Sequence, residues 1–253
     1  MSKTHPAARW HYLAALLPAG LFALLAVGLR RTADHHTFLW AVDWIPSLGV
    51  GLALRLDGLS MLFGLVITGV GAIVTLYSGA YLGGHPHGGR YQVLLQGFML
   101  AMVGLVLADD LILLFVFWEL TTFTSFLLIG FEHEKAAARE SARQALLVTG
   151  AGGLAMLAGF VLIGMAGGTH AMGPLLASGD LLRESPYYPA ILILVLVGAF
   201  TKSAQLPFHF WLPNAMTAPT PISAFLHSAT MVKAGIYLLT RLHPVLSGTT
   251  AWT

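Results

Sequence analysis

Cysteine is absent from this chain, and charged side chains are scarce. Without cysteine the protein holds no disulfide, no zinc–thiolate site and no cysteine-bound iron–sulfur cluster. Only 9% of its residues are charged, whereas a soluble domain has about 25%. Because 57% of the 253 residues are hydrophobic, the composition predicts a polytopic membrane protein whose partner is the lipid bilayer.

The motifs of several other protein classes are missing as well. The net charge is only +2 and the basic residues are scattered, so we expect no nucleic-acid partner. Neither a paired-histidine metal motif nor a glycine-rich nucleotide loop occurs. The sequence therefore predicts no metal site, no other cofactor and no catalytic residue, so we do not expect an enzyme.

Seven apolar segments are long enough to cross a bilayer, which takes about 20 residues. The first is too long for the core of a signal peptide and is interpreted as a retained span. Residues 43–49 are predicted to form an extended loop or hairpin at a membrane interface. The predicted fold is all-α, a polytopic transmembrane helix bundle with spans at 10–29, 57–82, 92–108, 110–131, 143–166, 188–212 and 220–243.

Three ionisable residues interrupt these apolar segments near their middles: Glu119, Lys202 and Lys233. A charge at that depth costs roughly 2.5–3.5 kcal/mol on insertion scales. Charges of both signs that are retained at such cost point to ion movement. The alternative interpretation is a set of structural ion pairs inside the bundle.

Polar residues and prolines accompany these charges. Glu119 is followed by Thr121, Thr122, Thr124 and Ser125, whose hydroxyls are candidates to hold water or relay a proton. Pro207 predicts a broken helix near 202–213, and broken helices often mark the ion site of a transporter.

Two histidines are candidates for proton transfer because histidine titrates near neutral pH. His209 lies seven residues after Lys202 and would share its helix face if the helix were unbroken. His227, Thr230 and Lys233 are three residues apart, so a continuous helix would make them neighbours.

Small residues and basic residues give two further expectations. Ala151, Ala155 and Gly159 form a small-residue ladder that lets helices approach closely. Basic residues favour a cytoplasmic N-terminus only weakly, six against five. One side would hold Lys3, Arg9, Arg90, Lys135, Arg139 and Arg143, and the other Arg30, Arg31, Arg55, Arg183 and Arg241.

Four long motifs carry a family resemblance: Leu56–Ser60, Phe115–Thr122, Lys202–Pro213 and Ala218–Gly235. They resemble the antiporter-like membrane subunits shared by respiratory complex I and Mrp-type multisubunit cation/proton antiporters. The resemblance runs from about Trp44 to the end of the chain. Within this superfamily the chain is most similar to the A-type subunits of Mrp antiporters, judged from the run ending at Thr122 and from Lys233.

The resemblance implies a division of the chain. Residues 1–91 would hold N-terminal spans and the interfacial loop, and residues 92–253 the first of two inverted five-helix repeats, with its broken helix. The second repeat would lie beyond Thr253, so the chain is either a piece of a longer protein or a half-unit completed by another chain. Residues 1–253 alone are expected neither to fold stably nor to exchange ions.

The resemblance also implies roles for the candidate residues. Glu119 resembles the family's central carboxylate, Lys202 its partner lysine on the broken helix, and Lys233 the lysine of the following helix. His209 and His227 would be polar neighbours along a proton path. From the charges we expect Glu119 and Lys202 to face each other, and Lys233 to line a hydrated interior path.

The implied protein is a membrane subunit of a Na+ or K+/H+ antiporter. It would sit in the plasma membrane of a bacterium or archaeon, among other small hydrophobic antiporter subunits. One alternative is the proton-pumping membrane subunit of an NADH–quinone or related oxidoreductase. The other is a non-transporting scaffold whose three charges are only structural.

Overall fold

In a computed structural model, residues 12–32, 37–45, 50–82 and 84–252 are described. Six helices in these ranges are long and apolar enough to cross a membrane: Tyr12–Arg30, Gly58–Tyr81, Gly88–Leu107, Leu111–Ile129, Ala136–Gly167 and Thr220–Leu246. A shorter apolar helix covers Tyr188–Lys202. The predicted helical membrane bundle is confirmed, but the sixth predicted span stops as a regular helix at Lys202 and not at residue 212.

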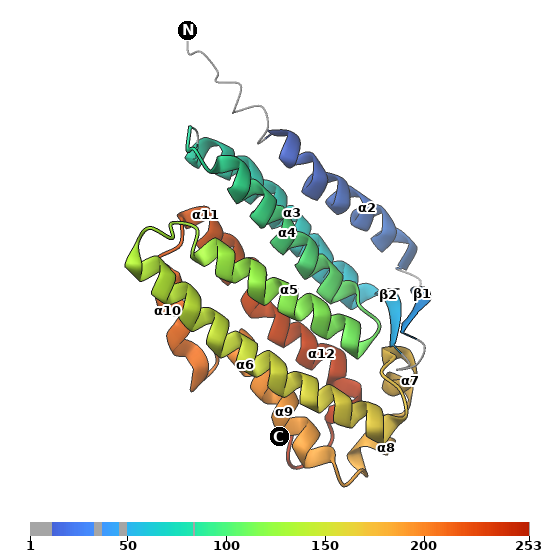
Figure 1. The fold of residues 1–253 in the computed structure, drawn as a ribbon. Coiled ribbons are helices and arrows are strands. Elements are labelled where there is room, and N and C mark those ends of the chain that lie inside the picture. The colour runs from blue at the N-terminus through green and yellow to red at the C-terminus, as the bar shows by residue number, and fades with distance from the viewer. Residues whose placement is uncertain (1–11, 33–36, 46–49, 83, 253) are drawn as a thin grey trace.

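The long helices lie side by side in chain order (Figure 1). They are α2 (Leu16–Thr32), α3 (Gly58–Tyr81), α4 (Gly88–Leu107), α5 (Leu111–Ile129) and α6 (Ala136–Gly167). Helix α9 (Tyr188–Lys202) packs along α6, and α12 (Ala234–Leu246) packs against both α9 and α4. Short connections between α3 and α6 explain this order, because a tight turn makes consecutive helices antiparallel neighbours.

A β-hairpin follows α2. Strand β1 (Phe38–Ile45) pairs antiparallel with β2 (Val50–Leu56), and Phe38 lies opposite Leu56. The hairpin predicted around residues 43–49 is therefore confirmed by its two strands, although residues 46–49 lie outside the described part. It is the only paired sheet in the described ranges.

The hairpin is joined to the bundle through the turn between α4 and α5. The backbone N–H of Asp109 donates to the carbonyl of Ala53 at 2.8 Å, and Arg55 forms an ion pair with Asp109 at 2.5 Å. On the other side, the N–H of Met172 donates to the carbonyl of Asp109 at 2.8 Å. These bonds fix the end of the bundle that also carries α7 (Met172–Ala177) and α8 (Gly179–Arg183).

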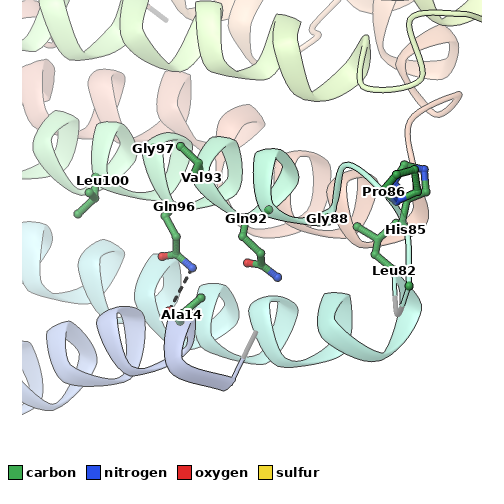
Figure 2. Close-up of a pocket in the computed structure, with 12 residues that line it drawn as sticks. Ala14, Leu82, His85, Pro86, Gly88, Gln92, Val93, Gln96, Gly97 and Leu100 are labelled. Carbon is green, nitrogen blue, oxygen red and sulfur yellow. Dashed lines mark hydrogen bonds between the residues drawn. The ribbon is translucent and has the colours of Figure 1, made fainter. Parts of the chain in front are cut away.

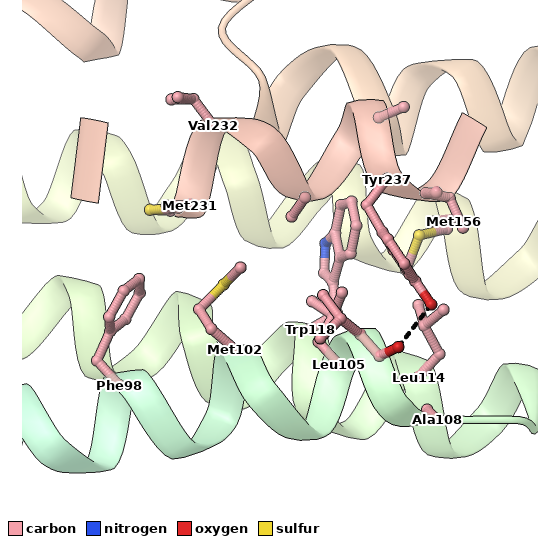
Figure 3. Packing of buried hydrophobic residues seen from close by; sticks show 14 of the residues in the cluster. Phe98, Met102, Leu105, Ala108, Leu114, Trp118, Met156, Met231, Val232 and Tyr237 are labelled. Carbon is pink, nitrogen blue, oxygen red and sulfur yellow. Dashed lines mark hydrogen bonds between the residues drawn. The ribbon is translucent and has the colours of Figure 1, made fainter. Parts of the chain in front are cut away.

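The core lies where α12 meets α4 and α5 (Figure 3). Trp118 and Leu105 are fully buried there, as is Tyr237. The Tyr237 hydroxyl donates to the carbonyl of Val106 at 2.8 Å. Because lipid is as apolar as these side chains, close packing and such interhelical hydrogen bonds hold the helices together.

A second cross-bundle contact joins the start of α3 to α12. Asp57 caps the N-terminus of α3 by accepting from the N–H of Ser60, and it also forms an ion pair with Arg241 of α12. Burial of the Asp57 carboxyl opposes its ionisation, but hydrogen bonds from Arg241 and Ser60 outweigh burial and lower the pKa of Asp57. Arg241 was counted above as a loop residue. It is instead buried in α12, only 6% exposed.

Removing Asp57 should destabilise the protein strongly. In Asp57→Ala the buried guanidinium of Arg241 keeps its charge but loses its partner, a loss of about 3 kcal/mol. Thermal unfolding of the natural full-length protein, assembled with its partners and solubilised in detergent, measures this loss of stability. Asp180→Ala is the matched control, because Asp180 also pairs with an arginine but its side chain is 86% exposed. Equal melting temperatures for the two variants would contradict the assigned role of the Asp57–Arg241 pair.

Candidate functional site

Lys202 lies at the last residue of α9 and is fully buried. Its ammonium group donates to the carbonyl of Trp118 at 2.9 Å and to the hydroxyl of Thr122 at 2.6 Å. It also lies 5.1 Å from the centre of the Trp118 ring, within range of a cation–π interaction. The helix turn of α5 that carries Glu119 therefore holds the lysine head group.

Glu119 is half-buried on the same turn. It lies one residue after Trp118 and three before Thr122, the two residues that hold the Lys202 ammonium group. However, none of the four ion pairs found among the described residues includes either residue. The Oε1 atom of Glu119 is buried and has no hydrogen-bond partner in the described part of the chain. Glu119 and the head group of Lys202 thus lie at the same turn of α5. They do not form the expected direct ion pair, because Lys202 bonds to Trp118 and Thr122 instead.

The end of α9 explains how the lysine can be held there. The helix stops directly after Lys202, and Ala204 takes a positive φ of 50° that no regular helix contains. The indole N–H of Trp211 donates to the carbonyl of Thr201 at 2.9 Å and so satisfies one of the free carbonyls of the helix end. A helix C-terminus also favours a positive charge, which Lys202 supplies.

Two adjacent glycines of α6 make the site possible. A Cβ at Gly152 would meet the Cβ of Thr201 at 2.6 Å, and a Cβ at Gly153 would collide with Oε1 of Glu119. Gly235 likewise admits the start of α12 against the end of α9. Sequence reasoning chose Ala151, Ala155 and Gly159 as the packing ladder. Of these, only Gly159 is buried, and Ala151 is exposed.

The two candidate histidines occupy different environments. His227 is half-buried, its ring centre lies 6.1 Å from that of Trp211, and in the described residues neither ring nitrogen has a hydrogen-bond partner. His209 lies in the 3-10 turn Phe208–Phe210 and is exposed. Trp211 thus lies between His227 and the end of α9, where its indole bonds to the residue before Lys202. The structure does not place His209 on the helix face of Lys202, because α9 has already ended.

The seventh span is not the continuous α-helix that the three-residue spacing assumed. After α11 (Thr220–Ser223) the chain forms a π-helical turn, Ala224–Ala229, and then a 3-10 turn, Met231–Lys233. Thr230 between them has φ −128° and ψ −82°, and its hydroxyl donates to the carbonyl of Phe225 at 2.6 Å. The expected stacking of His227, Thr230 and Lys233 is therefore wrong, because the helical period changes twice across them.

Lys233 lies at the start of α12 and is exposed on the surface of this chain. It shares that exposure with His209, whereas Lys202 is buried and Glu119 is half-buried. The candidate residues therefore divide into two sets. Glu119, Lys202 and His227 lie inside this chain, and His209 and Lys233 lie on its surface.

The hydroxyls beside Glu119 mostly bind their own helix. Thr121 donates to the carbonyl of Trp118 at 2.7 Å, and Ser125 donates to that of Thr122 at 2.8 Å. Thr122 differs because it also accepts from Lys202. The sequence indicated Thr122 only as a hydroxyl that could hold water or relay a proton, and it did not indicate Trp211 as a site residue. The signal for Thr122 was its place one turn after Glu119, and for Trp211 its place just beyond the helix break.

Residues 108–253 match the protein family described as "NADH:quinone oxidoreductase/Mrp antiporter, TM". The chain belongs to this family. Residues 42–92 match a second family description, "NADH-Ubiquinone oxidoreductase (complex I), chain 5 N-terminus". The resemblance inferred from the four motifs is thereby confirmed.

Curated relatives in the family carry antiporter names. The chain is 51% identical, over 94% of its length, to a protein of Rhizobium meliloti named as a probable K(+)/H(+) antiporter subunit of type A/B. It is 46% identical, over 93% of its length, to a Na(+)/H(+) antiporter subunit of type A1 from Staphylococcus haemolyticus. The chain spans only 23% and 29% of these two proteins.

Two solved structures contain a similar fold. A chain of the Mrp complex from a Dietzia species matches with a TM-score of 0.82 and 40% identity, over 97% of this chain and 28% of that one. An archaeal membrane-bound sulfane sulfur reductase matches with a TM-score of 0.77 over 97% of this chain and 38% of that one. At 21% identity the second match establishes the fold alone.

The glycine contacts give a stability test of the site. In Gly152→Ala the new methyl group would overlap Thr201, so α6 and α9 must separate, at a cost of about 1–3 kcal/mol. Gly150→Ala is the matched control on the same helix, because nothing lies within 4 Å of its added Cβ. We expect thermal unfolding in detergent to show a lower melting temperature for Gly152→Ala only. A loss of the same size in both variants would contradict the close approach of α6 and α9.

Proposed function

We propose that this chain is part of a membrane subunit of a multisubunit Na+ or K+/H+ antiporter, and that Glu119 and Lys202 form its proton-transfer centre. The relatives named above supply the antiporter assignment. The observation that carries the site assignment is the fully buried ammonium group of Lys202, held by Trp118 and Thr122 on the turn of Glu119. An intramembrane ionisable residue with named partners is by default a functional site.

The geometry supports a loading and release step. Both acceptors of the Lys202 ammonium group are neutral, so in our proposal the carboxylate of Glu119, on the same turn of α5, balances its charge without a direct bond. The buried and unpartnered oxygen of Glu119 can accept a proton in the space left by Gly153. A proton that moves between these groups changes both charges, and the helix end at Lys202 responds to that change.

The remaining candidates extend the route in our proposal. His227 takes the proton beyond Trp211, and its ring nitrogens have no competing bond in the described residues. His209 and Lys233 stand on the surface of this chain, where the rest of the natural protein would cover them and enclose a hydrated path. A charge facing lipid at that depth would be costly.

From the family and the names of the relatives we also propose a division of the chain, its partners and its location. Residues 92–253 would form one five-helix repeat, and residues 1–91 the spans and hairpin before it. The partners would be other small hydrophobic antiporter subunits, and the transported ions would be Na+ or K+ and H+. The protein would be located in the plasma membrane of a bacterium or archaeon. The driving force would be the proton gradient and not a cofactor reaction.

Loss of the carboxylate should remove transport. Glu119→Ala in the natural full-length protein, assembled with its partners, should abolish Na+- or K+-dependent proton flux in membrane vesicles while the protein still inserts. A pH-sensitive dye in the vesicles reads this flux. The control is Glu134→Ala, which removes an exposed glutamate at the α5–α6 connection and should leave the flux unchanged.

Near-normal proton flux in Glu119→Ala would contradict the site assignment. It would favour the alternative interpretation, a non-transporting scaffold protein whose charges are only structural. Copurification decides the other alternative. Recovery of this chain with flavin and iron–sulfur polypeptides, and not with small hydrophobic subunits, would make it part of an oxidoreductase.

The role of Lys233 is separable by charge-preserving substitution. Lys233→Ala should stop proton flux, and Lys233→Arg should not restore it, because arginine keeps the charge but hardly deprotonates. The same vesicle assay measures both variants. Full turnover in Lys233→Arg would mean that Lys233 is a fixed electrostatic element and not a proton carrier.

A further inference from the structure

A cavity of about 340 Å³ opens where α4 begins, α5 ends and α6 begins. Three arginines line it: Arg90 of α4, and Arg139 and Arg143 of α6. Phe126 and Leu127, from the last turn of α5, supply an apolar wall between them. Positive charge and apolar surface therefore meet at one end of the membrane bundle. A larger pocket, lined by Ala14, Gln92 and Gln96, lies between the residues just before α2 and the first half of α4 (Figure 2), but its lining contains no aspartate, glutamate, lysine or arginine.

These arginines keep their positive charge available. None of the four ion pairs found among the described residues includes any of the three. Arg139 donates to the backbone carbonyls of His133 and Glu134, at 2.6 and 2.9 Å, which positions its guanidinium without neutralising it. All three side chains are exposed and so accessible to a ligand.

An apolar stripe leads away from the cavity along α5. Leu127, Phe123 and Leu120 are 38%, 55% and 44% exposed. Their spacing of three and four residues places them on one face of the helix. The stripe runs from the arginines toward the middle of the span, between α4 and α6, which flank α5 (Figure 1). A ligand that follows it has an anionic end and a long apolar end.

We propose that this cavity binds the head group of an anionic phospholipid, with its phosphate on the three arginines and an acyl chain along the α5 stripe. Arginine binds phosphate through two parallel hydrogen bonds, and basic pockets between membrane helices on the cytoplasmic side suit such head groups. The weak bias of basic residues, six against five, favours the cytoplasmic side for this end of α4 and α6. The inference goes beyond proton transfer, because no residue of the Glu119–Lys202 centre takes part.

Lipid binding can be counted directly. The natural protein, assembled with its partners and delipidated in detergent, is titrated with phosphatidylglycerol or with phosphatidylcholine, and bound lipid is measured by native mass spectrometry. We expect preferential binding of phosphatidylglycerol. The combined variant Arg90→Gln, Arg139→Gln, Arg143→Gln should bind it at least ~10-fold more weakly, with little change for phosphatidylcholine.

Two further variants keep the test decisive. Replacing the three arginines by lysine keeps the charge and should preserve part of the preference. Arg30→Gln with Arg183→Gln removes exposed or partly exposed arginines at the other end of the bundle and should change nothing. An unchanged preference in the triple glutamine variant, or an equal loss in the Arg30/Arg183 control, would overturn the proposal. So would full displacement of phosphatidylglycerol by inorganic phosphate, since the site would then bind a free anion.

Discussion

A lysine ammonium group buried inside a membrane bundle has to be solvated by the protein itself, and the arrangement around Lys202 follows from that need. The carbonyl of Trp118 and the hydroxyl of Thr122 take the place of water around the charge. The C-terminal end of α9 adds the negative side of a helix dipole. If the helix continued regularly through residue 203, Lys202 would no longer lie at a helix C-terminus and would lose the stabilisation by the dipole. The break after Lys202 therefore helps to stabilise the buried charge.

The break has consequences for the neighbouring helices. It frees backbone carbonyls, and Trp211 folds back to satisfy that of Thr201. To enclose the lysine, α5 and α6 must also lie close to each other and to α9. Gly153 permits the approach of α5 to α6, and Gly152 that of α9 to α6. Far from this centre, the Asp57–Arg241 and Arg55–Asp109 pairs hold the hairpin end of the bundle together. The Lys202 centre thus lies beside a carboxylate of which one oxygen has no hydrogen-bond partner in the described residues, whereas the arginines of the two pairs at the hairpin end each have a carboxylate partner.

Much of this could be predicted because it depends on local sequence. Apolar length determined the spans, Pro207 marked the break, and the cost of buried charge singled out Glu119 and Lys202. What failed depends on tertiary contacts. The π and 3-10 turns around Thr230 come from no local signal that was recognised, and they displaced the expected alignment of His227 with Lys233. The pairing of Asp57 with Arg241 joins residues 184 positions apart, and the choice of Gly152 over Ala151 depends on which face of α6 meets α9.

In our proposal Glu119 and Lys202 act as one charged unit, and a double-mutant cycle measures how much each stabilises the protein through the other. Thermal unfolding of the assembled natural protein would be measured for Glu119→Gln, Lys202→Gln and the combined variant. Each single change leaves one buried charge without its counterpart, whereas the combined change leaves none. We expect the double variant to lose clearly less stability than the sum of the two single losses. Strictly additive losses would contradict it.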